Sequence, residues 1–153
     1  MTTVETVLVR PVVRFREFPF GTRGDPSIVE FTSEQPQVHQ RDLLRYLRSG
    51  LITGIAMGGS LPDYIDRSKK ADATIDGKMM GELPASPGLW GGVNEMTDGE
   101  WGWHVALIYY VENYNVRLPE EFIKHARRHH WQVNHDAVPA SNYVFDYHVR
   151  VPA

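Results

Sequence analysis

The sequence predicts an α+β domain in which about three helices pack mainly on one face of an antiparallel sheet. Two observations favour antiparallel pairing. Asp76-Gly77 and Asp98-Gly99 are each flanked by residues able to form strands, and Asp-Gly supplies the positive φ angles of a type I′ hairpin turn. Over residues 142–151, apolar and polar residues largely alternate, which is typical of a strand with one buried face. A chain of 153 residues predicts a single domain, residues 1–153.

The N-terminal segment has the composition of a strand but contains a proline that limits its pairing. Its apolar positions over residues 6–18 are mostly β-branched or aromatic. Because Pro11 has no amide hydrogen to give to a ladder, we expect either an edge strand or two short strands that meet at a bulge. After a turn rich in Gly and Pro, residues 27–31 predict a second short strand.

The first helix is predicted over residues 39–49. Leucines recur there at the spacing of one apolar stripe. Gly50 follows directly, where a glycine in the left-handed conformation would end the helix. The segment that comes next, residues 51–92, is rich in Gly, Pro, Ser and Asp and contains a short helical segment near residues 63–68. Loops carry function more often than their length suggests, although a surface loop of no special purpose explains this composition equally well.

Two more helices are predicted in the second half of the chain. Residues 105–111 are almost continuously apolar, and periodicity alone does not separate a buried strand from a buried helix there. We predict a helix over residues 104–114 because Leu107, Val111 and Tyr114 keep helical spacing. The third helix begins near Pro119, which suits the start of a helix because it lacks an amide hydrogen.

The hairpin around Asp98-Gly99 brings two tryptophans together. A two-residue turn places Met96 opposite Trp101 and Asn94 opposite Trp103, with both indoles on one face. Such a pair is usually a packing wall, and it can also line a ligand pocket.

Composition excludes several classes of function. The chain has no cysteine, so disulfides, thiolate zinc sites and cysteine nucleophiles are absent. Its net charge is −3, from 16 Lys+Arg against 19 Asp+Glu, which argues against nucleic acid as the main partner. No apolar run approaches the roughly 18 residues of a membrane span, and no signal peptide is recognisable, so we expect a cytoplasmic protein without a membrane partner. Neither a phosphate loop nor a dinucleotide fingerprint occurs, and we predict no cofactor.

Histidines are concentrated near the end of the third helix. His125 and His129 are four residues apart and would share a helix face, which is the geometry of a helical metal pair. The residues between them are Ala-Arg-Arg, however, and the glutamate of an HExxH motif is missing. A basic helix end that complements the helix dipole is the favoured interpretation, and we predict no metal site.

One segment resembles a known group of proteins. Thr97-Asp98-Gly99-Glu100-Trp101-Gly102-Trp103, the Tyr109-Tyr110-Val111 core and Leu118-Pro119-Glu120-Glu121-Phe122 are similar to a pattern in small uncharacterised actinobacterial proteins. The resemblance covers less than a fifth of the chain and implies no activity. Small bacterial proteins with this aromatic content include immunity proteins that neutralise a toxin. The analogy is one of size and composition, not of any shared motif.

Two hypotheses about function follow. The first is a non-enzymatic protein-binding role, as an accessory or immunity-type protein, in which aromatic and arginine side chains anchor another protein. The alternative is a small-molecule-binding enzyme with an aromatic pocket. The candidate lining residues of that pocket are Trp90, Trp101, Trp103 and Tyr109. The candidate proton-transfer residues are His104, Asp98 and Glu100.

Overall fold

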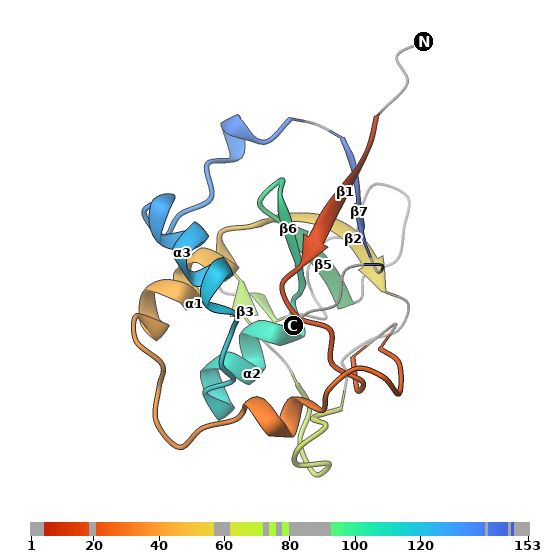
Figure 1. Ribbon diagram of the computed structural model, residues 1–153, viewed down its shortest axis with the longest axis vertical. Helices are drawn as coiled ribbons and strands as arrows, with labels where there is room; N and C mark the ends of the chain where they lie inside the picture. Colours follow the sequence, from red (N-terminus) through yellow and green to blue (C-terminus); the bar gives the residue numbers. More distant parts are fainter. Residues whose placement is uncertain are drawn as a thin grey trace.

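The protein combines a five-stranded sheet with three α-helices, which confirms the α+β class (Figure 1). The computed structural model describes residues 5–18, 21–56, 62–71, 74–75, 78–79, 93–139, 141–146 and 148. Counts and absences reported for the structure refer to these residues. Within the described ranges, no helix combines the length and the apolar character that crossing a membrane requires.

The main sheet is mixed, so the prediction of a purely antiparallel sheet is wrong. Its strands are β1 (Thr6–Pro11), β2 (Leu51–Ala56), β5 (Val93–Thr97), β6 (Trp101–His104) and β7 (Asn142–Phe145). They lie in the order β2-β5-β6-β1-β7. β5 pairs antiparallel with β2 and β6, whereas β1 runs parallel to both β6 and β7. Antiparallel pairing can be predicted from local turns. The parallel pairing of β1 cannot, because β1 lies between two strands that come about 90 and 135 residues later in the chain.

β1 lies inside the sheet, between β6 and β7, so it is neither an edge strand nor a pair of strands joined at a bulge (Figure 1). The amides of Arg10 and Val12 donate to β6, to the carbonyls of Glu100 and Gly102. Alternate residues of a strand bond to opposite neighbours, so Pro11 faces the side of β7. The ladder with β7 ends at Val9. The missing amide hydrogen of Pro11 therefore interrupts no pairing.

Both predicted hairpins are present, and the second differs in register. In the smaller sheet, β3 (Thr74–Ile75) pairs antiparallel with β4 (Lys78–Met79). The turn residues Asp76 and Gly77 themselves lie outside the described residues. In the main sheet, Thr97 pairs with Gly102 and Met96 with Trp103, so four residues, 98–101, rather than two lie between the last paired residues of the β5–β6 ladder.

The side chain of Asp98, the first residue after β5, explains the longer β5–β6 turn. Oδ1 of Asp98 accepts hydrogen bonds from the amides of Glu100 and Trp101, at 2.9 and 2.7 Å. A side chain that mimics a backbone turn in this way holds four residues out of the ladder. Gly99 adopts a φ of 99° within this turn, a conformation that suits glycine because it has no Cβ.

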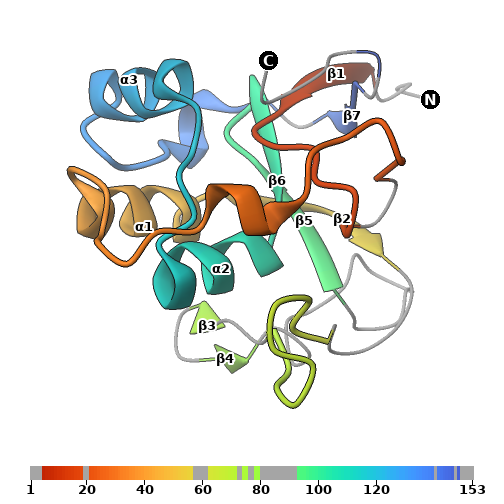
Figure 2. The ribbon, with the colours of Figure 1, turned by 60° about the horizontal axis from the view of Figure 1, so that its bottom comes forward.

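The three predicted helices are confirmed as α1 (Gln40–Arg48), α2 (Ala106–Tyr114) and α3 (Glu120–Arg128). Figure 2 shows them together on one side of β5 and β6. Trp103 of β6 is buried among them, because its indole nitrogen donates to the carbonyl of Leu47 and its ring packs edge-on against Phe122. Gly50 does not have the predicted left-handed conformation. A Cβ at Gly50 would lie 2.5 Å from Cζ2 of Trp103, so close packing explains the glycine.

Two short segments fold differently from their predictions. Residues 27–31 contain no strand; Ile28–Phe31 forms a 3-10 helix instead. Ser27 and Glu30 form a reciprocal capping box there, whose spacing is a helix-start signal. Near residues 63–68 the chain turns without forming a helix, because Oδ1 of Asp63 accepts from the amides of Ile65 and Asp66. A second 3-10 helix, His135–Ala137, follows α3.

The predicted alternation in the last strand holds over the part that is described. In β7, Tyr143 and Phe145 are buried, whereas Asn142 and Val144 are exposed. Tyr143 and Phe145 form a small cluster with Val9 of β1, apart from the main core between the helices and the sheet. Residues 147 and 149–151 of the predicted strand lie outside the described residues.

Candidate functional site

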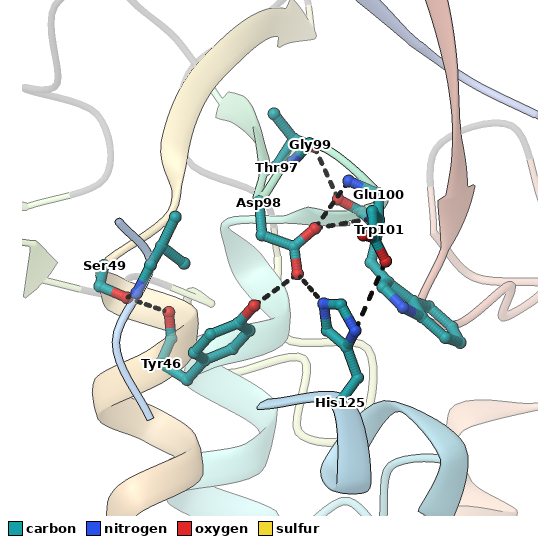
Figure 3. Close-up of polar contacts among 9 residues, drawn as sticks. Tyr46, Ser49, Thr97, Asp98, Gly99, Glu100, Trp101 and His125 are labelled. Carbon is teal, nitrogen blue, oxygen red and sulfur yellow. Dashed lines mark hydrogen bonds and ion pairs between the residues drawn. The ribbon is translucent and has the colours of Figure 1, made fainter. Parts of the chain in front are cut away.

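Three elements that are distant in sequence meet at one carboxylate, that of Asp98 (Figure 3). Asp98 begins the turn after β5, His125 lies on α3 and Tyr46 lies on α1. Nε2 of His125 is 2.9 Å from Oδ2 of Asp98, and the Tyr46 hydroxyl donates to the same oxygen at 2.6 Å. The Asp98 and His125 side chains are 3% and 7% exposed, which makes this a buried contact between a carboxylate and an imidazole.

The surroundings of Asp98 favour its ionised form. Burial opposes the charge, whereas the hydrogen bond from His125 and the one from the Trp101 amide stabilise it. Further hydrogen bonds from Tyr46 and the Glu100 amide act in the same direction, so the pKa of Asp98 lies below its usual value. Donors to a carboxylate stabilise the charged form. A negative charge therefore stays fixed at this position near neutral pH.

Tyr46 acts as a hydrogen-bond donor throughout the physiological range. Burial raises the pKa of its phenol, and the nearby charge of Asp98 raises it further. The Tyr46 ring packs against Trp103, Phe122 and His125. This packing fixes the hydroxyl that orients Asp98.

The second nitrogen of His125 faces a different kind of carboxylate. Nδ1 is 3.5 Å from Oε2 of Glu100, whose side chain is 71% exposed. His125 is thus placed between one buried and one exposed carboxylate. Because Asp98 occupies Nε2, the nitrogen available to another molecule is Nδ1, once the Glu100 side chain turns towards solvent.

Two cavities adjoin His125. The first has a volume of about 270 Å³ and is lined by residues that include Tyr46, Asp98, Glu100, His125, His129 and Asn134. The second has a volume of about 290 Å³ and is lined by Arg10, Glu100, Trp101, Glu121, His125 and Arg128. His125 and Glu100 belong to both linings. A small molecule in either cavity would therefore meet the imidazole.

The structure brings together several of the residues that the sequence singled out. Asp98 and Glu100, the candidate proton-transfer residues, both contact His125, a candidate metal ligand. His125 and His129 share a helix face as expected, with ring centroids 4.6 Å apart. Across the described part of the chain, no group of three or more His, Cys, Asp or Glu side chains is placed to hold a metal ion.

His104 is separate from this cluster. It is buried, its Nδ1 accepts from the Ala106 amide at 3.1 Å, and its ring lies 6.0 Å from that of Phe18. Burial lowers the pKa of His104 to about 4, so the imidazole is neutral at pH 7. In the β5–β6 ladder it lies opposite Glu95 rather than near Asp98.

The predicted aromatic pocket is not assembled by the described residues. Trp103 is 1% exposed and belongs to the core between the helices and the sheet. Tyr109 donates its hydroxyl to the buried carboxylate of Asp63 at 2.7 Å. Trp101 packs on Phe122 and lines the second cavity. Trp90 lies outside the described residues.

Sequence reasoning missed Tyr46, although a signal for it exists. Leu43, Tyr46 and Leu47 lie on the buried stripe of α1. A tyrosine on such a stripe needs a polar partner for its hydroxyl, because an unpaired buried hydroxyl is costly. The pattern therefore indicates a buried acceptor somewhere, without identifying it as Asp98.

The arrangement can bind and transfer a proton. A carboxylate that accepts from one imidazole nitrogen fixes the ring and its tautomer, and leaves the other nitrogen to act as a base or, when protonated, as an acid. No family model matches the chain, and no curated protein or solved structure matches it either.

Proposed function

We propose that this protein binds a small polar molecule beside His125 and uses the imidazole as its proton-transfer group. The observation that supports this proposal is the contact between the buried Asp98 and Nε2 of His125, at 2.9 Å. An ionised, buried carboxylate fixes the direction and the tautomer of the imidazole. This is the small-molecule hypothesis from the sequence, with His125 in place of His104.

The exposed side of His125 supports ligand entry. Glu100 contacts Nδ1 at 3.5 Å with a side chain that is 71% exposed, so it can turn towards solvent without leaving a carboxylate buried. Tyr46 and two backbone amides hold Asp98 in place when that happens. A ligand would thus find a preformed base and displace only a mobile surface contact.

The protein-binding hypothesis stays a prediction with less support. Its proposed anchors were exposed aromatic side chains together with arginines, and the aromatic side chains of Trp101, Trp103 and Tyr109 are each 9% exposed or less. Buried side chains cannot serve as interface anchors without rearrangement of the core. We therefore place the small-molecule role first.

Binding can be tested by NMR on the whole protein. A library of small polar compounds, neutral and charged, is titrated while the histidine ring signals and the backbone amide signals are recorded, because His125→Asn has no His125 ring to observe. We expect compounds that shift the His125 signals and that lose affinity at least tenfold in His125→Asn. His130→Asn is the matched control, because His130 lies two residues beyond the end of α3, lines neither cavity and has a φ of 56°, which asparagine tolerates. Binding that is unchanged in His125→Asn would overturn the proposal.

Proton transfer needs a second measurement, for which hydrolysis of 4-nitrophenyl acetate is suitable. We expect His125→Asn to lower the rate constant and His130→Asn to leave it unchanged. Glu100→Ala distinguishes an effect at Nδ1 from a folding defect. Because Glu100 is exposed, this variant should keep the fold, and it should raise the rate constant by uncovering Nδ1. Equal rates in the wild type and all three variants would contradict a proton-transfer role for His125.

A further inference from the structure

The second cavity beside His125 carries paired opposite charges. Its lining contains Arg10 and Arg128 as well as Glu100 and Glu121, together with Trp101 and His125, and the ion pair among them joins Arg10 to Glu121. The residues come from β1, the β5–β6 turn and α3. The backbone fixes part of this wall, since the Arg10 amide donates to the Glu100 carbonyl at 2.9 Å.

Arg10 is oriented to receive a carboxylate. Its guanidinium carbon lies 4.6 Å from the centroid of the Trp101 ring, so the aromatic face holds the guanidinium in place. Nη1 is 3.0 Å from Oε1 of Glu121. Nε of Arg10 is buried and has no hydrogen-bond partner among the described residues. A guanidinium held in this way forms planar, often two-point contacts with carboxylates.

The two carboxylates that now occupy the cavity are easily displaced. The side chains of Glu100 and Glu121 are 71% and 64% exposed, and exposed pairs of this kind are weak. Arg128 has no ion-pair partner among the described residues, so its charge adds to that of Arg10. When Glu100 turns towards solvent, the guanidinium groups of Arg10 and Arg128 and the carboxylate of Glu121 remain in the lining of the cavity. Glu121 pairs with Arg10 and Asp98 contacts Nε2 of His125, so the charge of Arg128 is the one left to attract an anion.

We infer that the ligand carries a carboxylate group, which takes the place of Glu100 beside His125 and is held by Arg10 and Arg128. This inference rests on the proposed function, because it names the ligand class of the same site. When Nδ1 carries a proton, a ligand carboxylate makes the contact with the imidazole that Glu100 makes in the free protein. Glu100 therefore competes with the ligand carboxylate for the place beside His125.

Acetate is the probe and acetamide its neutral counterpart of similar shape. Each is titrated into the whole protein at constant ionic strength with sodium chloride, and the His125 ring signals give the dissociation constant. We expect acetate to bind at least fivefold more tightly than acetamide. Arg128→Gln should weaken acetate binding severalfold, and because Arg128 is exposed this variant keeps the fold.

Glu100→Gln gives the sharpest test. Removal of an exposed competing pair should tighten acetate binding about 1.5- to 5-fold. Glu120→Gln is the matched control. It removes one negative charge, as Glu100→Gln does, but at a residue of α3 that pairs with Lys124 and lines neither cavity. Glu120→Gln should leave the acetate affinity unchanged.

The outcomes separate this inference from the proposed function. Equal binding of acetate and acetamide, or equal effects of Glu100→Gln and Glu120→Gln, would overturn the carboxylate inference while neutral compounds still bind beside His125. If no compound of any charge shifts the His125 signals, the proposed function and the inference both fail.

Discussion

The hydroxyl of Tyr46 and Nε2 of His125 both contact Oδ2 of Asp98, from 2.6 and 2.9 Å. Tyr46 lies on α1, His125 on α3 and Asp98 in the turn between β5 and β6. One carboxylate oxygen therefore connects two helices to the sheet. The same contact that orients His125 towards the cavities also stabilises the packing of the helices, so stability and ligand binding depend on one group.

Replacement of Asp98 by asparagine is expected to destabilise the protein by about 2–4 kcal/mol, because the variant removes one partner of a buried charged contact. Asparagine keeps a carbonyl oxygen for the turn amides, so the hairpin should survive. Urea unfolding at pH 7 measures the change. Asp136→Asn, at an exposed position, should stay within about 0.5 kcal/mol of the wild type. Similar stabilities for the two variants would contradict this role of Asp98.

Stability should fall on acidification because of His104. Burial lowers its folded pKa to about 4 from an ordinary value of 6.5, so below pH 6.5 the unfolded chain binds a proton that the folded chain does not. The associated stability is complete above pH 6.5 and is lost as the pH falls towards 4, by about 2 kcal/mol between pH 7 and pH 5. Urea unfolding at both pH values measures this loss.

His104→Asn isolates that contribution. Its side-chain oxygen can accept from the Ala106 amide as Nδ1 of His104 does, but it does not titrate. We expect the variant to be less stable at pH 7 and to lose less stability between pH 7 and pH 5. A wild-type pH dependence that His104→Asn reproduces unchanged would show that His104 does not titrate in this window.

A second buried carboxylate, Asp63, predicts a loss of stability at lower pH. Burial opposes its ionisation, but hydrogen bonds from the Tyr114 and Tyr109 hydroxyls and from two amides hold its pKa below the usual value. Its stabilising effect is therefore present above about pH 4 and is lost as the pH falls through the folded pKa. Tyr114→Phe removes a donor to a charged acceptor and should cost about 1.5–3 kcal/mol.

The same variant should raise the pH of acid unfolding, because Asp63 then binds a proton more readily in the folded state. Tyr143→Phe is the matched control, since the Tyr143 hydroxyl donates to the neutral carbonyl of Pro139. It should cost about 0.5–1.5 kcal/mol with no shift of the acid transition. Circular dichroism between pH 2 and pH 6 reports both transitions, and equal shifts in the two variants would contradict the ionised state of Asp63.

Gly102 is expected to tolerate no side chain. A Cβ at this position of β6 would overlap the ring of Phe145 on β7, across the intervening strand β1. Gly102→Ala should destabilise the protein by about 1–3 kcal/mol, because overpacking forces neighbouring groups to move. Phe145→Leu in the same chain should recover part of that loss, measured as a favourable coupling energy in a double-mutant cycle. Strictly additive effects would show that the two residues do not touch.

Local features of the chain were predictable from the sequence because their causes are local. The stripe of α1 and the alternation in β7 each reflect one buried face of one element. The spacing of Leu107, Val111 and Tyr114 indicated the helix α2, although its residues 106–111 are all buried. Both hairpins follow from Asp-Gly pairs. The pattern Ser27-x-x-Glu30 contained the information for the 3-10 helix, although composition favoured a strand there.

The tertiary structure decided the pairing of β1 and the make-up of the candidate site. β1 pairs with β6 and β7, which are distant along the chain, and such pairing depends on the packing of the whole domain rather than on any turn. Asp98 and Glu100 were recognisable as candidates. Their partnership with His125 and Tyr46 was not, because it arises where α1 and α3 pack against the β5–β6 turn. The sequence by itself determined the three helices, the hairpins and the buried faces of α1 and β7. Only the packing of the elements against one another determined which polar groups share a site.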